Sequence, residues 1–393
     1  MSSEAYYDYN ATSELDKQVR QAMIDSLNVF GNPSSRHSYG TAAKAIVSEA
    51  RESVARLIGC EPEAVKFTSG GSESNNWAIK GLLEASGHRG RAHLITTVIE
   101  HPSVMQVCAY LERTGQAAVT YLPVDQAGAV SIAELEAAIR PETRLITMML
   151  ANNEIGTIQP IREAALLARS RGILMHTDAV QAAGKLPIDV RQLGVDALSM
   201  SAHKFGGPKG VGALYVRPGV ELEPLIHGGG QEFGLRSGTE NVVGLAGLGK
   251  AAAVLDRAKM EAQLVQWSKL KRMVVNRLTE LVPDCRFNGP VDGSEALPNT
   301  INIEITGIRG ESLAAYIGVK HGAAVSVGSA CSATKQASLS HVLRAIGRSD
   351  EQIRSAVRIS FGPAAGEAEM EKLICQLAEA ALHLRALSVV GAV

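Results

Sequence analysis

Short apolar segments rich in β-branched residues alternate with longer segments of helical period through about the first 250 residues of the chain. The longer segments, such as residues 161–169, repeat their apolar positions every three or four residues, which predicts helices. This alternation predicts an α/β fold, in which a mostly parallel sheet is covered by helices on both faces. The segments predicted as strands are residues 65–68, 93–98, 145–150, 173–176, 197–200 and 211–216.

The pattern changes near residue 256. A long helix, strands near 300–303 and 357–360, and a terminal helix follow, which predicts a smaller α+β domain after a large one. The first residues of the chain are too few to fold alone and are expected to pack against these domains. The predicted division is therefore an N-terminal segment, a large domain and a small domain, over residues 1–13, 14–255 and 256–393.

Composition narrows the class of protein. Of the 393 residues, 46% are apolar and 20% are charged, which is typical of a globular protein. The 39 basic and 40 acidic residues give a formal net charge of −1, so no overall field favours direct binding to nucleic acid or to an anionic membrane. The start of the chain lacks the basic and apolar regions of a secretory signal, and no run of about 18 apolar residues is present. We therefore expect a cytoplasmic protein.

The number and spacing of the cysteines indicate a protein from a reducing compartment. They are five in number, scattered, and without C-x-x-C spacing, which indicates reduced thiols and argues against a structural zinc site. The five are Cys60, Cys108, Cys285, Cys331 and Cys375.

Two predicted strands end in residues that suit one cofactor. Lys204 directly follows the strand at 197–200, and Asp178 ends the strand that begins at 173. Pyridoxal 5'-phosphate needs an amine to form a Schiff base with its aldehyde, and a carboxylate that keeps its ring nitrogen protonated. Because strand ends of an α/β sheet converge, the pair predicts a pyridoxal phosphate site. Lys209 is a competing amine, and a helix cap is the alternative role for Asp178.

A glycine-rich turn supplies the predicted phosphate site. Residues 67–76 run from a strand through Gly70 and Gly71 into a helix, which offers backbone N–H groups to an anion. The hydroxyls of Ser72 and Ser201 and the imidazole of His203 add donors. The alternative is an ordinary N-cap at Ser72 or Ser69, and both interpretations are compatible.

Polar residues also follow the two neighbouring strands. His101 follows the strand at 93–98, where an imidazole stacked on the cofactor ring would move protons at neutral pH. Asn152 follows the strand at 145–150, where it would bind the cofactor's phenolic oxygen or a substrate carboxylate. The alternatives are an ordinary loop or core histidine and an Asx turn.

Two further segments contain candidate functional residues. Residues 228–241 contain too many glycines for a regular element, so their backbone would approach a ligand or another subunit closely, or form a surface loop. Cys331 lies among small polar residues ahead of a helix near Ser340, and an exposed thiol there would ionise and attack a substrate. The alternative is a small residue at a strand end.

Taken together, these motifs resemble the cysteine desulfurases of the nitrogen-fixation and iron–sulfur-cluster type. These are fold-type I pyridoxal phosphate enzymes of the class V aminotransferase superfamily. The resemblance covers nearly the whole chain, from Tyr7–Thr12 and Gly31–Ser35 to Arg358–Gly362. It implies a homodimer that converts L-cysteine to L-alanine and passes the sulfur to Cys331 as a persulfide. A sulfur-acceptor protein would dock near Cys331 and use the sulfur for iron–sulfur clusters, thio-cofactors or RNA.

The resemblance also implies a role for each residue. Lys204 forms the Schiff base and moves the Cα proton, and His101 stacks on the ring and accepts protons during the cycle. Arg358, together with Asn152, binds the substrate carboxylate. The remaining cofactor contacts are Asp178 at the ring nitrogen, Gln181 at the phenolic oxygen, Gly71, Ser72, Ser201 and His203 at the phosphate, and Thr239 at the phosphate of the other subunit.

Three positions depart from the family pattern. Ser72 stands where threonine is usual, Phe233 where a basic residue is frequent, and residues 333–337 differ from the usual approach to the following helix. The rival interpretations are a selenocysteine lyase, an aminotransferase of the same superfamily, and a non-catalytic scaffold of the same fold.

Overall fold

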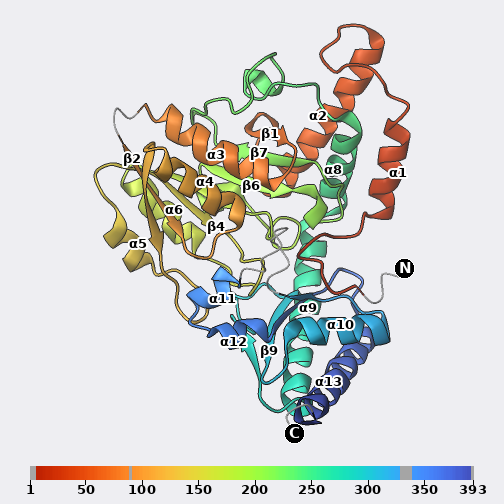
Figure 1. The fold of residues 1–393 in the computed structure, drawn as a ribbon. Coiled ribbons are helices and arrows are strands. Elements are labelled where there is room, and N and C mark those ends of the chain that lie inside the picture. The colour runs from red at the N-terminus through yellow and green to blue at the C-terminus, as the bar shows by residue number, and fades with distance from the viewer. Residues whose placement is uncertain (1–5, 88–90, 328–338, 391–393) are drawn as a thin grey trace.

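The computed structural model describes residues 6–87, 91–327 and 339–390, and its elements form two parts around two sheets (Figure 1). The strands of the first part are β1 (Val65–Thr68), β2 (Ala92–Thr97), β3 (Ala117–Leu122), β4 (Thr143–Met149), β5 (Leu174–Asp178), β6 (Ala197–Ser201) and β7 (Gly212–Val216). The α-helices around them are α1 (Lys17–Ser26), α2 (Ser38–Ile58), α3 (Gly71–Ala85), α4 (Pro102–Arg113), α5 (Ile132–Ala138), α6 (Ile161–Ser170), α7 (Val190–Leu193) and α8 (Val242–Val254).

The large sheet has seven strands in the order β1-β7-β6-β5-β4-β2-β3. Strands β3, β2, β4, β5 and β6 pair in parallel, whereas β7 is antiparallel to both of its neighbours. Strand β1 therefore points the same way as the parallel set. The predicted mostly parallel α/β sheet is confirmed.

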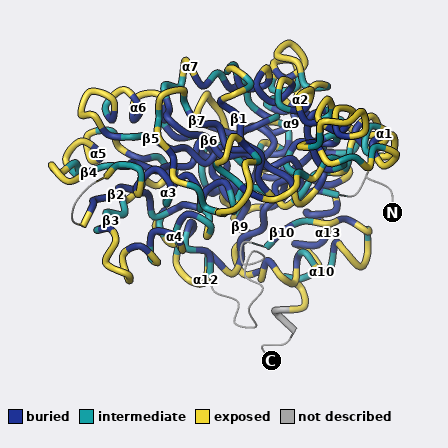
Figure 2. The backbone as a smooth tube through the Cα atoms, turned by 90° about the horizontal axis from the view of Figure 1, so that it is seen from above, coloured by how far each residue is buried: buried dark blue, intermediate teal, exposed yellow. Residues whose placement is uncertain are grey.

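Alternate residues of the strands face two separate apolar cores. Leu94 and Leu145 pack in the core formed with α3 and α4, whereas their neighbours Ile95 and Ile146 pack in the core formed with α2, α6 and α8. Both faces of the sheet are thus covered, and the central strands β5, β6 and β7 run through the most buried part of the molecule (Figure 2). The buried residues of these strands include polar ones, such as His176 on β5 and Ser199 on β6, which hydrogen-bond to each other across the two strands at 2.9 Å.

The second part is built on a four-stranded antiparallel sheet in the order β10-β11-β9-β8. Its apolar core contains side chains of α9, α10 and α13, and α9 runs from beside the large sheet down to this part (Figure 1). Here the strands are β8 (Cys285–Asn288), β9 (Thr300–Ile305), β10 (Ser326–Val327) and β11 (Ala356–Ser360), and the helices are α9 (Arg257–Leu281), α10 (Gly310–His321), α11 (His341–Ala345), α12 (Asp350–Arg354) and α13 (Glu367–Val390). The division predicted at residue 256 falls between α8 and α9, and the separation into domains stays a prediction.

The N-terminal segment lies between the two parts. Tyr9 N–H donates to Ser360 O at 3.1 Å in the small sheet, and Ser13 N–H donates to His203 O at 2.8 Å after β6. The backbone between these residues therefore crosses from one sheet to the other. Among the helices of the described residues, none contains an apolar stretch of the length that a lipid bilayer requires.

The glycine-rich segment 228–241 is tied to the large sheet by a buried ion pair. Arg51 on α2 makes two hydrogen bonds to Glu232, at 2.7 and 2.8 Å, and Phe67 N–H donates to the same carboxylate at 2.9 Å. The side chains of Arg51 and Glu232 are 12% and 3% exposed. Glu232 and Phe233 both have positive φ, 46° and 62°, so this ion pair holds a backbone conformation that side-chain-bearing residues rarely adopt.

We expect Arg51→Met to lower the free energy of unfolding by about 3 to 5 kcal/mol, because it leaves the Glu232 carboxylate buried without its cation. Urea denaturation at pH 7 measures the loss. The matched control is Arg191→Met, whose pair with Glu61 is 65% and 66% exposed and should contribute about 1 kcal/mol or less. Equal losses in the two variants would contradict the expectation.

Candidate active site

Five predicted site segments meet at the carboxyl edge of the large sheet. Strands β1, β2, β4, β5 and β6 point the same way, so the residues that follow them emerge at one edge. These segments contain the turn at Gly70, His101, Asn152, Asp178 and Lys204. The convergence expected from the sequence is present in the fold.

Lys204 ends the short 3-10 helix η3 (Ala202–Lys204), which follows β6 without a break. The residue is half-buried, and its Nζ atom donates to Asn10 O at 2.6 Å and to Ala11 O at 2.9 Å. Lys209, the competing candidate, is exposed. The N-terminal segment thus supplies carbonyl acceptors that hold the Lys204 amine at the site.

Asp178 is the last residue of β5 and is buried. Its Oδ1 atom accepts from Val180 N–H at 2.9 Å, and its Oδ2 atom accepts from Asn75 Nδ2 on α3 at 2.7 Å. The alternative role as a cap of the next helix is wrong, since that helix, α7, is capped by Asp189. Asp178 therefore presents a buried, fixed carboxylate at the sheet edge.

The glycine turn after β1 packs closely against β6, β7 and the residues that follow β5. A Cβ atom on Gly212 of β7 would lie 2.6 Å from Gly70 Cα, and one on Gly71 would lie 2.5 Å from Val180 Cγ2 and 3.7 Å from Ser201 Cβ. The turn is therefore packed closely against Ser201 and the residues after β5. The N–H groups of the first turn of α3 have no acceptor within the helix and face this region.

The predicted cap of α3 needs correction. Neither Ser69 nor Ser72 is the N-cap, which is Gly70 with φ 148°, a conformation that glycine adopts readily. Ser69 N–H instead donates to Glu73 Oε2 at 2.9 Å, and Ser72 is exposed. Glycine has no side chain that could cap the helix, and the exposed Ser72 lies in the first turn.

His203 is held by the N-terminal segment. Its Nδ1 atom lies 3.2 Å from Thr12 Oγ1. Burial lowers the pKa of His203 to about 4, and the nearby charges of Lys204 and Lys209 contribute to this decrease. The imidazole is therefore neutral at pH 7, so it offers a hydrogen bond rather than a charge to an anion.

His101 is the N-cap of α4, and its Nδ1 atom lies 2.8 Å from Ser103 Oγ. Burial lowers the pKa of His101; Asp178 opposes this, and Lys204 and His341 add to it. Hydrogen bonds through Ser103 and Asn75 join the His101 ring to Asp178. The structure thus brings together His101, Asp178 and Lys204, which lie far apart in the sequence.

Gln181 and a buried lysine form a polar group beside Lys204. Gln181 Nε2 donates to Asn10 O at 2.8 Å, and Lys185 Nζ donates to Gln181 Oε1 and to Asn10 Oδ1, each at 2.8 Å. Burial lowers the pKa of Lys185 well below its ordinary value, and Lys204 and Arg358 lower it further. The contact of Gln181 with a cofactor oxygen stays a prediction.

Arg358 on β11 reaches the same region from the small sheet. It is buried, with Nη1 donating to Asn153 O at 2.9 Å and Nη2 to Asp8 Oδ1 at 2.6 Å. Its Nε atom has no hydrogen-bond partner among the described residues. Two hydrogen bonds thus fix the guanidinium in place, and the Nε–H group remains unused among the described residues.

Asn152 forms the Asx turn that was the alternative interpretation. Its Oδ1 atom accepts from Glu154 N–H at 2.8 Å and from Ile155 N–H at 3.0 Å, and its Nδ2 atom donates to Ile99 O at 3.1 Å. These bonds stabilise the turn after β4. A contact between Asn152 and a ligand stays a prediction.

Of the remaining predicted residues, the structure describes Thr239 but not Cys331. Thr239 is exposed in the segment that precedes α8, and a contact with a second subunit stays a prediction. Cys331 lies outside the described residues. The other four cysteines are free thiols, and burial raises the pKa of Cys60 and of Cys108 to about 12.

A buried carboxyl group adjoins His101. Glu100 Oε1 accepts from Thr97 Oγ1 at 2.7 Å and from Met149 N–H at 3.0 Å, and Oε2 has no partner in the described part of the chain. Burial raises the pKa of Glu100 from 4.5 to about 8, against the opposing effect of these two hydrogen bonds. The folded protein therefore retains at neutral pH a proton that the unfolded chain releases.

This proton makes stability depend on pH. Because the pKa is higher in the folded state, the stability it contributes is present below pH 4.5 and is lost as the pH rises towards 8. We expect Glu100→Gln, which is neutral throughout, to gain about 2 to 4 kcal/mol relative to the wild type between pH 5 and pH 8. Urea denaturation at both pH values tests this, with the exposed Glu84→Gln as control. A difference that does not change with pH would contradict the expectation.

Several residues of the site were not assigned a role from the sequence. Asn10, Asn75 and Ser103 lie inside the motifs considered, but only the fold shows that their side chains or carbonyls bond to site residues. Lys185 lies outside those motifs, and Gly212 was considered only as part of a predicted strand. The one available signal was a lysine four residues after Gln181, in the same otherwise apolar stretch.

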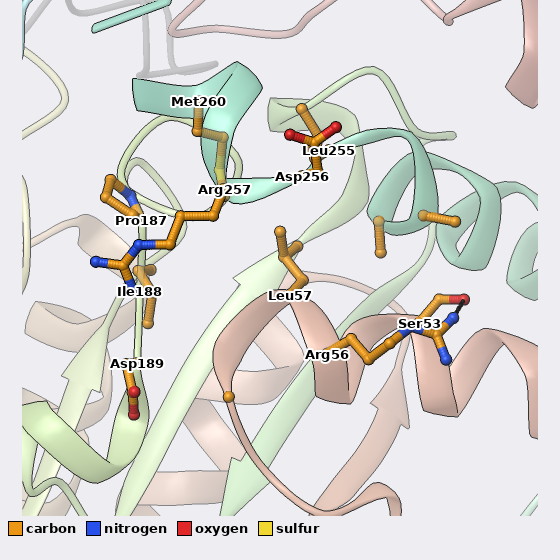
Figure 3. A pocket seen from close by; sticks show the side chains of 13 residues that line it. Ser53, Arg56, Leu57, Pro187, Ile188, Asp189, Leu255, Asp256, Arg257 and Met260 are labelled. Atoms are coloured by element: carbon orange, nitrogen blue, oxygen red, sulfur yellow. Dashed lines mark hydrogen bonds between the residues drawn. The ribbon is translucent and has the colours of Figure 1, made fainter. Parts of the chain in front are cut away.

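A cavity of 360 Å³ lies elsewhere and takes no part in this site. It is lined by α2, the end of α8, the start of α9 and residues 187–189, and none of the predicted site residues lines it (Figure 3). Arg56, Arg257, Asp189 and Asp256 give it charges of both signs (Figure 3). This mixed lining favours neither an anion nor a cation.

Comparison with known proteins places the chain in a family. The Aminotransferase class-V profile matches residues 5–373. Cysteine desulfurase IscS of Clostridium botulinum is 44% identical over 375 residues, which span 95% of this chain and 93% of that protein. Cysteine desulfurase IscS of Methanosarcina thermophila is also 44% identical, over 98% of this chain and 93% of that protein.

Solved structures agree with these relatives. A NifS-like protein has a TM-score of 0.87 at 38% identity and covers 95% of this chain and 98% of its own. SspA in complex with cysteine has a TM-score of 0.79 at 38% identity, over 91% of this chain and 99% of its own.

Proposed function

Because this chain belongs to the aminotransferase class-V family, we propose that it is a pyridoxal 5'-phosphate-dependent cysteine desulfurase. It converts L-cysteine to L-alanine and transfers the sulfur to Cys331 as a persulfide. The observation that carries the proposal is the meeting of Asp178, Lys204 and His101 at one sheet edge, in a chain whose curated relatives are named cysteine desulfurases.

The residues at the sheet edge fit pyridoxal 5'-phosphate. A half-buried amine (Lys204) and a buried carboxylate (Asp178) suit its aldehyde and its ring nitrogen. The turn at Gly70 and Gly71, without Cβ atoms, lets the N–H groups of α3 approach a phosphate, and Ser72, Ser201 and His203 add donors. Bound there, the cofactor supplies an electron sink that allows the Cα–H bond of the substrate to ionise.

The side chains of this protein then have separate tasks. Lys204 Nζ takes the Cα proton of the substrate and returns a proton later in the cycle. Asp178, held by Val180 N–H and Asn75, keeps the negative charge that balances a protonated ring nitrogen. Gln181 would donate to the phenolic oxygen of the cofactor, His101 would stack on its ring, and Arg358 with Asn152 would bind the substrate carboxylate.

Cys331 accepts the sulfur. Its thiolate attacks the sulfur of the substrate, so that a new S–S bond forms while the Cβ–S bond breaks. The electron pair of the broken bond is protonated at Cβ, which becomes the methyl group of L-alanine. A thiolate is required because the neutral thiol is a poor nucleophile.

We also propose an oligomeric state for the protein and a destination for the sulfur. A homodimer would place Thr239 of each subunit at the phosphate of its partner, and the exposure of Thr239 in one subunit supports this. A sulfur-acceptor protein docks near Cys331 and delivers the sulfur to iron–sulfur clusters, thio-cofactors or RNA. A cytoplasmic location is supported by the free thiols of the four described cysteines.

The experiment that tests the function supplies L-cysteine and a thiol reductant to the protein loaded with pyridoxal 5'-phosphate. We expect L-alanine and sulfide in equal amounts. A selenocysteine lyase would release selenide from L-selenocysteine but little sulfide from L-cysteine. An aminotransferase would need a 2-oxo acid and release no sulfide, and a scaffold would turn over neither amino acid; each of these results would reject the proposal.

A further inference from the structure

Four side chains form one hydrogen-bonded chain at the carboxyl edge of the large sheet. His101 Nδ1 lies 2.8 Å from Ser103 Oγ, Asn75 Nδ2 lies 2.9 Å from the same Oγ, and Asn75 Nδ2 lies 2.7 Å from Asp178 Oδ2. These hydrogen bonds connect the second turn of α3 and the start of α4 with the end of β5. They join the two residues that the proposed function places above and beside the cofactor ring.

The direction of each bond follows from its partners. A carboxylate oxygen accepts, so the amide nitrogen of Asn75, rather than its oxygen, faces Asp178. Its second proton points to Ser103 Oγ and occupies a lone pair of that oxygen. The hydroxyl proton of Ser103 is then left to donate to His101 Nδ1.

A second donor reaches the same ring nitrogen. Ser103 N–H lies 3.2 Å from His101 Nδ1, and a backbone N–H can only donate. His101 Nδ1 must therefore be an acceptor with no proton of its own. A neutral imidazole that lacks a proton on Nδ1 carries it on Nε2.

We propose that Ser103, oriented by Asn75, is a positioning residue that fixes His101 in the tautomer with its proton on Nε2. No described residue bonds to Nε2, so this edge of the ring is the one available to a ligand. The tautomer follows from the hydrogen bonds to His101 Nδ1. A role for this tautomer in the turnover of L-cysteine rests on the proposed function.

The charged surroundings agree with a neutral ring. The groups that act on His101 are Asp178 at the end of β5, Lys204 on η3 and His341 at the start of α11. Burial has the largest effect and lowers the pKa of His101, and Lys204 and His341 act in the same direction, whereas Asp178 opposes them. Protonation would also have to occur at Nδ1, where two donors already point.

This arrangement changes the role expected of His101. A ring with its proton on Nε2 donates a hydrogen bond to substrate or cofactor and does not accept a proton at that edge. The family resemblance implies instead that His101 accepts protons during the cycle. The geometry makes it a hydrogen-bond donor to an oxygen or sulfur atom, so the proton of the Cys331 thiol needs another acceptor.

The test is an NMR measurement on the holoenzyme labelled with ¹³C-histidine, because the ¹³Cδ2 shift distinguishes the two neutral tautomers. The His101 signal is identified by its loss in His101→Gln. We expect the Nε2–H tautomer and a pKa below that of free imidazole. The Nδ1–H tautomer in the wild type would overturn the proposal, and this holds even if a variant fails to fold.

Variants of Ser103 separate positioning from a merely structural role. We expect Ser103→Ala to raise the pKa of His101 by about 0.5 to 1, since the hydroxyl bond that stabilises the neutral ring is lost. Ser103→Thr keeps the hydroxyl and should restore the wild-type value, and Asn75→Leu should raise the pKa in the same direction as Ser103→Ala. An unchanged pKa in Ser103→Ala would overturn the proposal.

Two controls belong to the same experiment. Ser131→Ala removes a serine that caps α5 by accepting from Glu134 N–H, and it should leave the His101 signal unchanged. His37 caps α2 through Nδ1, which accepts from Gly40 N–H at 3.2 Å, and its signal should stay constant in all variants. If the tautomer is found but L-cysteine yields no sulfide, the proposed function fails while this inference stands.

Discussion

Replacing Lys204 with alanine should lower the turnover of L-cysteine by at least about 1,000-fold and remove the visible absorption of the bound cofactor. Both effects have one cause, because the amine that links the cofactor is also the group that moves the Cα proton. Sulfide release and the absorption spectrum of the reconstituted protein measure them. Borohydride reduction followed by mass spectrometry should place the cofactor on the peptide that contains Lys204 in the wild type.

The matched control is Lys209→Ala, a little further along the chain. Lys209 is exposed, whereas Lys204 donates to two carbonyls of the N-terminal segment. We expect Lys209→Ala to keep the spectrum and most of the turnover. Cofactor attached to residue 209, or wild-type turnover in Lys204→Ala, would contradict the proposed site.

Replacing Cys331 with serine should reduce sulfide release from L-cysteine by at least about 1,000-fold while leaving the cofactor spectrum intact. A hydroxyl at this position does not ionise near neutral pH and does not form a persulfide. Mass spectrometry of the protein after L-cysteine treatment should find one added sulfur on residue 331 in the wild type and none in the variant.

The control for this variant is Cys375→Ser, since Cys375 is an exposed free thiol on α13. We expect Cys375→Ser to retain wild-type turnover and persulfide on Cys331. Sulfide release at the wild-type rate from Cys331→Ser would reject the sulfur-transfer step. An aminotransferase would show no dependence on this residue, because it uses Lys204 and Asp178 but needs no thiol.

The strands that end at the site were predictable because they are buried on both faces. Strands β5 and β6, for example, consist almost wholly of buried residues, and each begins with apolar residues, Leu174 and Met175 in β5 and Ala197 and Leu198 in β6. The edge strand β3 was not predicted, since four of its six residues are only half-buried and it begins with two alanines, which are not typical of strands. Strand β8, at the edge of the small sheet, was missed because it too is only partly buried.

The family and its cofactor were also within reach of the sequence. The polar residues that follow each buried strand are typical of an edge where a ligand binds, and the order of these motifs along the chain is enough to indicate the cysteine desulfurases. The family profile and the curated relatives confirm that assignment. The motifs, however, identified the types of residue at the site and not their hydrogen-bonding partners.

Local patterns along the chain therefore determined the α/β class, most of the buried strands and the set of candidate residues, because burial and turn chemistry act over a few neighbouring positions. The fold in three dimensions was needed for contacts between distant segments. Lys204 bonds to Asn10 and Ala11 in the N-terminal segment, more than 190 residues earlier in the chain, and Asn75 bonds to both Ser103 and Asp178. Such hydrogen bonds depend on which strands become neighbours and on the direction of each side chain, and no local pattern encodes either.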